Sequence, residues 1–406
     1  MIDWSVVANE LIRTRRVLAT HRDFGTAFGV FHIKQPFVPR LRNKRINLPT
    51  VVRLSTQIRK NGAPEDLPQM TYRFLGRSGL QVSAISLGGW LTYGGYTENE
   101  KTFECMKAAF DTGINFFDCA EVYASGKSEE VMGQAIKKYG WKRNDLVIST
   151  KLYWGTAFGD NPVNNKGLSR KHIIEGMDAS LKRLELEYVD VIYAHRPDRQ
   201  TPMEETVRAF NHLINTGKAL YWGTSMWDAD EIAQAWRYAD KLGLIGPVVE
   251  QPQYNMLYRE KVELEYAKLY REVGTGLTVF SPLAQGLLSG KYKNGIPDDS
   301  RLAQQQVEFI AGWWKRTGKE KFDETIQQIN QLEPIANDLG IKQSTLALAW
   351  VLKNPHVSSA IIGASSADQI YENVRAVAAV DKLTPEIMDK IDEILNNKPP
   401  ALVERY

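Results

Sequence analysis

From Tyr72 onward, short β-forming runs alternate with amphipathic helical runs, and this alternation constrains the fold more than any other feature of the 406-residue chain. Eight runs have strand character: 84–88, 115–118, 146–151, 189–195, 219–224, 248–253, 277–281 and 359–363. Helical patterns lie between or after them, at 98–111, 127–139, 170–184, 203–215, 228–241, 261–272, 344–353 and 367–374. Strands that alternate with helices predict right-handed crossovers and a parallel sheet.

Eight such units over ~335 residues predict an α/β fold, the (β/α)8 TIM barrel, whose active sites form at the carboxyl ends of the strands. A doubly wound sheet is the alternative, but the glycine-rich segment 88–95 (GGWLTYGG) does not match the G-x-G-x-x-G fingerprint, and the chain has no P-loop. Segment 72–82 predicts a β-hairpin, with its turn near Ser78, that closes the barrel bottom. Segment 289–322 is too long for an ordinary βα connection and predicts a functional lid. Segment 384–395 predicts a helix on the barrel exterior.

The first 69 residues have a different composition from the rest. Residues 1–62 contain 12 Lys and Arg against 3 Asp and Glu, whereas the remainder contains 39 against 45. Because this segment shows no clear hydrophobic period, we expect a disordered basic extension over 1–69, followed by the barrel over 70–406. The same composition occurs in mitochondrial transit peptides, so mitochondrial import stays open beside a cytoplasmic location.

The body of the chain excludes several classes of partner. Its mildly acidic balance does not support nucleic-acid binding. Its longest apolar stretches, such as 346–352, fall far short of the ~20 residues that span a bilayer, so we expect no membrane insertion. The two cysteines, Cys105 and Cys119, have neither metal-ligand spacing nor the number for a disulfide framework, which suits a reducing compartment.

Four polar side chains lie at or just past the ends of three apolar runs: Asp118, Tyr123, Lys151 and His195. Carboxyl ends of successive parallel strands meet at one face of a barrel, so these side chains can converge. A buried Lys151 needs an anion, which Asp118 supplies. The cation should lower the pKa of Tyr123 from ~10 and make the phenol a general acid. His195 could orient a substrate carbonyl. The group predicts a carbonyl reductase.

Neither a metal constellation nor a covalent nucleophile is visible in this group, so hydride from a nicotinamide is the expected reductant. Phe280 offers a flat partner for the ring, and Ser225 and Gln251 offer polar partners for its amide. Lys291 and Arg301 offer cations for the phosphates. The segment from Gly363 to Asn373 turns from strand to helix and presents free N–H groups to an anion.

These residues resemble the aldo-keto reductase superfamily over essentially 72–398, because Asp118-x4-Tyr123, Lys151 and His195 match its catalytic tetrad in type, order and spacing. The β subunits of voltage-gated potassium channels and their microbial relatives are more similar still. The stretches that carry this likeness are DCAEVYASG (118–126), GLSRKHIIE (167–175), RLELEYVD (183–190), RPDRQTPMEETV (196–207) and SPLA (281–284).

The resemblance implies NADPH as cofactor, a small carbonyl compound as substrate, and a homotetramer. It also implies a set of cofactor contacts: Trp90, Asp118, Ser225, Gln251, Ser281, Leu283, Lys291, Arg301, Ser365, Gln369, Glu372 and Asn373. The channel subunits typically have Asn where this chain has His195, which favours a working enzyme over a channel accessory. They have Arg where this chain has Met226, which puts one cofactor contact in doubt. The alternative function is a channel-binding regulatory subunit that uses bound NADPH as a redox sensor.

Overall fold

The computed structural model describes residues 62–90, 92–96, 98–156, 162–293 and 319–400. Eight parallel strands close into a barrel in the order β10-β3-β4-β5-β6-β7-β8-β9. Their bounds are β3 Ile85–Gly88, β4 Phe116–Asp118, β5 Val147–Leu152, β6 Val189–Ala194, β7 Ala219–Ser225, β8 Val249–Gln251, β9 Gly276–Phe280 and β10 Val357–Ile362. Each strand lies within a residue or two of its predicted run. The TIM barrel is therefore confirmed, and the doubly wound sheet is excluded because the sheet closes on itself.

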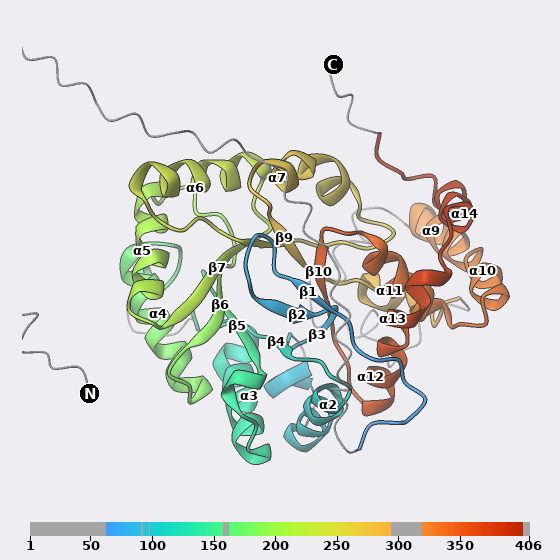
Figure 1. The fold of residues 1–406 in the computed structure, drawn as a ribbon, viewed down its shortest axis with the longest axis horizontal. Coiled ribbons are helices and arrows are strands. Elements are labelled where there is room, and N and C mark those ends of the chain that lie inside the picture. Colours follow the sequence, from blue (N-terminus) through green and yellow to red (C-terminus); the bar gives the residue numbers. More distant parts are fainter. Residues whose placement is uncertain (1–61, 91, 97, 157–161, 294–318, 401–406) are drawn as a thin grey trace, which may run out of the picture. The chain divides into compact units, whose positions relative to one another are not determined.

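Helices surround the strands as an outer layer (Figure 1). They are α2 Asn99–Asp111, α3 Lys127–Tyr139, α4 Arg170–Leu184, α5 Met203–Asn215, α6 Ala229–Leu242, α7 Ala267–Glu272, α9 Lys319–Asn330, α10 Glu333–Asp338, α11 Gln343–Lys353, α12 Ala367–Val374, α13 Ala376–Ala379 and α14 Pro385–Leu395. The predicted helix over 261–272 is divided, because a π-helical turn, Lys261–Glu265, precedes α7. The sequence patterns did not predict α9 or α10.

A β-hairpin closes the N-terminal end of the barrel, as the sequence predicted. Its strands, β1 Tyr72–Phe74 and β2 Gln81–Ser83, pair antiparallel. Leu75 and Val82 are fully buried in one cluster with Phe116 and Val147, the first residues of β4 and β5. The hairpin crosses the centre of the ring of strands in Figure 1. This closure leaves the opposite, carboxyl ends of the strands as the place for a site.

Residues 62–69 lie against the body although they belong to the predicted extension. The side chain of Leu67 is only 3% exposed. A carboxylate oxygen of Asp66 lies 2.5 Å from a guanidinium nitrogen of Arg375, just after α12. Burial of a leucine side chain contributes about 1.5–3 kcal/mol, whereas an exposed ion pair contributes little. The boundary at residue 69 stays a prediction, and the expected disorder concerns residues before 62, which lie outside the described part.

We predict that a chain beginning at residue 62 unfolds at the same temperature as the full chain. A chain beginning at residue 70 should also fold, but with a midpoint roughly 2–5 °C lower, because the buried Leu67 is lost. Thermal unfolding followed by circular dichroism measures both. A large loss in the chain that begins at residue 62 would show that the basic extension packs on the barrel.

The predicted lid over 289–322 falls mainly on residues 294–318, outside the described part of the chain, so its role stays a prediction.

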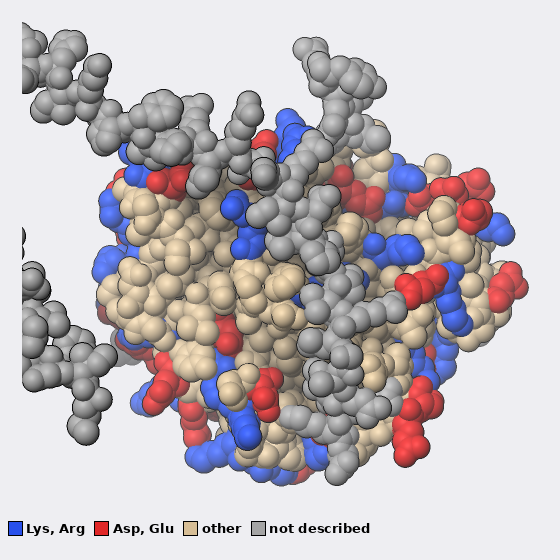
Figure 2. Space-filling model, in the orientation of Figure 1, with Lys and Arg blue, Asp and Glu red and all other residues tan. Residues whose placement is uncertain are grey.

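Figure 2 shows the face that carries the hairpin: basic and acidic side chains alternate around its rim, and no broad field of one sign covers its described residues. No helix among the described residues has both the length and the apolar character needed to cross a membrane.

Candidate active site

A buried ion pair joins the ends of β4 and β5. Lys151 is fully buried, and its Nζ lies 2.5 Å from Oδ2 of Asp118. The same nitrogen donates to the Cys119 carbonyl oxygen at 2.6 Å and to the Tyr123 hydroxyl oxygen at 3.2 Å. The structure therefore brings three of the four predicted catalytic side chains, Asp118, Tyr123 and Lys151, into direct contact.

Asp118 is also held by two neutral donors. The Ser149 hydroxyl donates to its Oδ1 at 2.7 Å, and Nε2 of Gln251 donates to the same oxygen at 3.2 Å. Ser149 was not among the predicted residues. It lies two positions before Lys151 in β5, and residues two apart in a strand point to the same face, so the strand period was a signal that could have revealed it.

Left-handed backbone follows Tyr123. Tyr123 begins a short 3-10 segment, Tyr123–Gly126, in which Ala124, Ser125 and Gly126 have φ values of 48°, 55° and 93°. Such values are unfavourable for alanine and serine and persist only where the surroundings enforce them. Among the described residues, six of the eight non-glycine residues with positive φ lie in the segments after β4, β7 and β9. Backbone strain is therefore concentrated at the carboxyl ends of the strands.

His195 completes the group. It directly follows β6, is 6% exposed, and its ring centroid lies 5.8 Å from that of Tyr123 in an edge-on arrangement. Burial, followed by the positive charges of Lys151 and Arg196, holds the pKa of His195 well below its ordinary value. The imidazole is therefore neutral at neutral pH. Its Nδ1 is buried and has no hydrogen-bond partner among the residues that the structure describes.

The pKa of Tyr123 departs from the prediction. Burial raises it, the Lys151 cation opposes that rise, and the net direction is upward from the ordinary value of 10.0. The expected lowering was wrong because the phenol is desolvated together with the ion pair. Burial also lowers the pKa of Lys151, but Asp118 and Tyr123 outweigh it and the net direction is upward. At neutral pH the site thus holds a protonated phenol beside a charged ammonium.

The residues predicted to meet a nicotinamide emerge at the same end of the barrel. Ser225, Gln251 and Phe280 are the last residues of β7, β8 and β9. The Ser225 hydroxyl donates to the Gln251 carbonyl oxygen at 2.9 Å, and Arg196 donates to Oγ of Ser225 at 3.4 Å. Trp90 lies just past β3 and is 38% exposed. Arg196 was not among the predicted site residues, although it directly follows His195.

Two buried polar side-chain atoms at this end of the barrel have no hydrogen-bond partner among the described residues. Oγ of Ser281 is buried and, like Nδ1 of His195, has no hydrogen-bond partner within the described ranges. Ser281 has a left-handed φ of 55°, and Asn255 donates to its carbonyl oxygen at 2.9 Å. Because buried polar atoms in folded proteins are nearly always hydrogen-bonded, two orphans at the strand ends fit a cofactor that supplies the missing partners.

The residues predicted to hold phosphates are less closely grouped. Nζ of Lys291 lies 4.8 Å from the ring centroid of Tyr292. Oε1 of Gln369 accepts from the Ser365 amide at 2.9 Å, at the N-terminus of α12. Glu372 is already engaged, because Thr345 donates to it at 2.7 Å and Lys342 lies 2.9 Å from it. Leu283 lies after β9, Gly363 directly follows β10, and Asn373 lies in α12. Arg301 lies outside the described residues, and all these cofactor contacts stay predictions.

Comparison with known proteins agrees with this geometry. The sequence profile described as the aldo/keto reductase family matches residues 84–396. A probable voltage-gated potassium channel subunit beta of Oryza sativa subsp. japonica is 51% identical over 331 residues, which are 81% of this chain and 98% of that protein. A putative voltage-gated potassium channel subunit beta of Schizosaccharomyces pombe is 55% identical over 338 residues, 83% of this chain and 95% of that one. The chain belongs to the aldo/keto reductase family.

Proposed function

We propose that this protein reduces aldehydes or ketones with NADPH and that Tyr123 is the general acid. The observation that carries the proposal is the contact of the Tyr123 hydroxyl with the buried Lys151 ammonium, 3.2 Å away, which is itself paired with Asp118. A protonated phenol beside a fixed cation can release its proton without leaving an isolated buried anion.

Each side chain has a separate task in this proposal. When bound, the nicotinamide of NADPH would provide the hydride that the carbonyl carbon accepts. Tyr123 gives its proton to the carbonyl oxygen, and the resulting phenolate is stabilised by Lys151. Asp118 keeps Lys151 charged. The neutral imidazole of His195 can direct a hydrogen bond at the same carbonyl oxygen, and the phenolate regains a proton from water after the alcohol leaves.

A panel of aliphatic, aromatic and cyclic carbonyl compounds, with NADPH consumption as the readout, tests the function. We expect repeated turnover on at least one class of aldehyde or ketone and formation of the matching alcohol. A protein that binds NADPH but consumes none with any member of the panel would contradict the reductase proposal.

We predict a preference for NADPH over NADH that depends on Lys291 and Arg301. The 2′-phosphate adds charge that two cations can meet with charge-assisted hydrogen bonds. Replacing both with alanine should weaken NADPH binding at least about tenfold more than NADH binding. Titration of both cofactors measures this. Lys293→Ala is the matched control, because Lys293 is paired with Glu333 at 2.9 Å. Equal losses for both cofactors would show that these cations do not meet the phosphate.

The names of the relatives favour a second candidate, a regulatory subunit of a voltage-gated potassium channel. We infer for this candidate that bound NADPH would serve as a redox sensor and that the assembly would be a tetramer. The rate of cofactor oxidation separates the two candidates. Many turnovers per site support the reductase. Slow oxidation of one cofactor per chain, without release of product cofactor, supports the regulatory subunit.

A further inference from the structure

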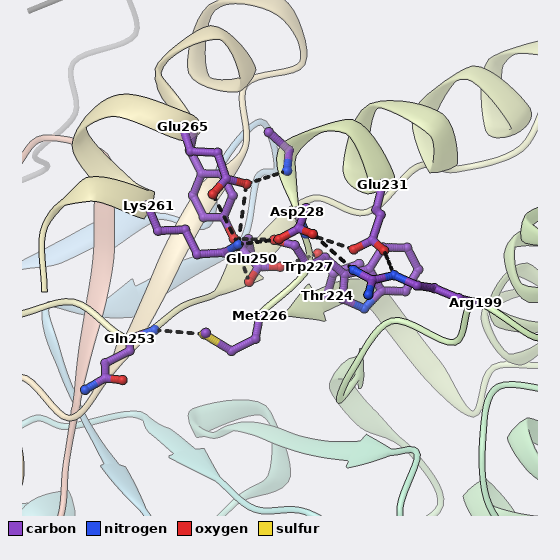
Figure 3. Close-up of polar contacts among 12 residues, drawn as sticks. Arg199, Thr224, Met226, Trp227, Asp228, Glu231, Glu250, Gln253, Lys261 and Glu265 are labelled. Carbon is purple, nitrogen blue, oxygen red and sulfur yellow. Dashed lines mark hydrogen bonds and ion pairs between the residues drawn. The ribbon is translucent and has the colours of Figure 1, made fainter. Parts of the chain in front are cut away.

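A second buried carboxyl group lies beside the candidate active site. Glu250 is fully buried in β8, between Val249 and Gln251. Because neighbouring strand residues point to opposite faces, Gln251 reaches Asp118 inside the barrel while Glu250 points toward the helical layer. There the Thr224 hydroxyl donates to Oε2 of Glu250 at 2.6 Å. Figure 3 shows Glu250 close to Thr224 and to the segment that joins β7 to α6.

The hydroxyl group of Tyr266 lies within reach of two hydrogen-bond acceptors, the Trp227 carbonyl oxygen and the Glu250 carboxyl group. The Tyr266 hydroxyl lies 2.5 Å from the Trp227 carbonyl oxygen and 3.3 Å from Oε1 of Glu250. A tyrosine hydroxyl has one proton, so it can satisfy only one acceptor fully. An ionised carboxylate is the stronger acceptor and draws the proton from the Trp227 carbonyl oxygen. A protonated Glu250 can instead donate to the Tyr266 oxygen, which leaves the whole Tyr266 proton to Trp227.

The Trp227 carbonyl belongs to the segment that carries Ser225, a predicted cofactor contact; we name residues 225–228 the β7 loop. Met226 in this loop has a left-handed φ of 57°. Its amide donates to the Gln251 carbonyl oxygen at 3.3 Å, and its sulfur accepts from the Gln253 amide at 3.4 Å. Figure 3 shows the Met226 side chain directed at Gln253. The rest of the loop is held more firmly, because Trp227 is buried and Asp228 is paired with Arg199 and Lys261. The Tyr266 hydroxyl adds a bond at the Trp227 carbonyl oxygen, between these anchors and the weakly bonded Met226.

Charged and titratable groups face Glu250 from the neighbouring elements: Tyr193 on β6, Arg196 after it, Lys261 and Glu265 in the π-helical turn, and Tyr266 and Tyr270 around α7. Lys261 is bound in turn to Asp228 at 2.8 Å. Burial raises the pKa values of Tyr193, Tyr266 and Tyr270. The pKa of Lys261, which burial lowers, is raised overall by its carboxylate partners, and an arginine stays charged. These tyrosines and cations therefore keep one charge state between about pH 5.5 and 8.5.

We propose that Glu250 and Tyr266 form a proton-linked tether of the β7 loop, so that NADPH binds more tightly when Glu250 is protonated than when it is ionised. The inference rests on the proposed function, because it takes the β7 loop as part of the cofactor site. A loop already fixed in place loses less conformational freedom when the cofactor binds.

The titration of Glu250 falls within the physiological range. Burial raises its pKa to about 7 from the ordinary 4.5, although Thr224 and other donors oppose this. Glu250 is therefore protonated below about pH 7 and ionised above it. Because the pKa in the folded state is the higher one, the contribution of Glu250 to folding stability is largest at low pH and declines as the pH rises through 7. Cofactor affinity should decline as Glu250 of the folded protein ionises, around and above pH 7.

Cofactor titrations of the full chain from pH 5.5 to 8.5 test the tether, with NADH included because it lacks the 2′-phosphate, which titrates in this range. The wild-type Kd for NADH should rise about fivefold between pH 6 and 8, which corresponds to one neutral hydrogen bond. Glu250→Gln cannot ionise and its amide can donate to Tyr266. This variant should keep the low-pH affinity throughout and bind about fivefold more tightly than wild type at pH 8.

A second variant distinguishes the effect of the Tyr266 hydrogen bond from the effect of packing of the tyrosine ring. Tyr266→Phe removes the hydroxyl, so its affinity should match the weaker, high-pH wild-type value at every pH. Tyr270→Phe is the matched control, because the Tyr270 hydroxyl donates to the Val262 carbonyl oxygen at 2.7 Å and not to the β7 loop, so the wild-type pH dependence should persist. The same pH dependence in Glu250→Gln as in wild type would overturn the tether alone. Failure of wild type to bind either cofactor at any pH would overturn the proposed function as well.

Discussion

Replacing Tyr123 with phenylalanine is expected to lower kcat by about 10²–10⁴-fold, the usual contribution of a general acid. The substitution removes one oxygen and keeps the aromatic ring, whose edge-on contact with His195 should persist. The phenol transfers its proton only in the transition state, so kcat should fall with little change in the Kd for NADPH.

Steady-state kinetics on the best carbonyl substrate, together with direct titration of NADPH, measures this result. Tyr139→Phe is the matched control, since Tyr139 is the last residue of α3 and lies outside the candidate site. Near wild-type turnover in Tyr123→Phe on several aldehydes would show that another group supplies the proton. His195 is the first alternative, and its lowered pKa would then have to appear in the pH profile of kcat.

The fold was predictable because it depends on local pattern. Eight β-rich runs separated by helical runs leave few topologies, and the strands begin and end near the predicted residues. The meeting of Asp118 and Lys151 was predictable for a related reason: both occur at strand ends, where a charged residue that interrupts an apolar run is easily recognised. Once the topology is known, neighbouring strands bring such residues together without any knowledge of side-chain packing.

What the sequence could not provide depends on three-dimensional burial. The sign of the Tyr123 pKa shift is the balance between desolvation and the Lys151 cation, and neither magnitude is visible in the motif. Glu250 precedes Gln251 in the run VVEQ and points to the opposite face of the strand. The sequence pattern suggested a role for the inward-facing Gln251 but gave no sign that Glu250 is buried under the helices. Leu67 lies in a segment without a period, so its burial against the body gave no signal. These differences all concern which side chains lose contact with water.

The largest expected effect on stability comes from breaking the buried ion pair. Removing one partner of such a pair leaves an uncompensated charge and typically costs about 3–5 kcal/mol. In Asp118→Asn, the buried Lys151 keeps the Cys119 carbonyl and the Tyr123 hydroxyl as partners but loses its anion. We expect the free energy of unfolding to fall by about that amount at pH 7, together with loss of turnover.

The two halves of the pair should respond differently to pH. Without Asp118, burial is the dominant influence on Lys151 and places its pKa below that of the unfolded chain, so the native state binds fewer protons. The stability of Asp118→Asn should therefore rise with pH, relative to wild type, up to about pH 10. In Lys151→Met, Asp118 keeps Ser149 and Gln251 as donors, so no such rise in stability above neutral pH is expected.

Denaturant unfolding of both variants and of the double variant between pH 6 and 9 measures the coupling free energy between Asp118 and Lys151. A loss below about 1 kcal/mol in Asp118→Asn, without a pH slope, would mean that Lys151 is neutral in the folded protein and that Tyr123 has no fixed cation beside it.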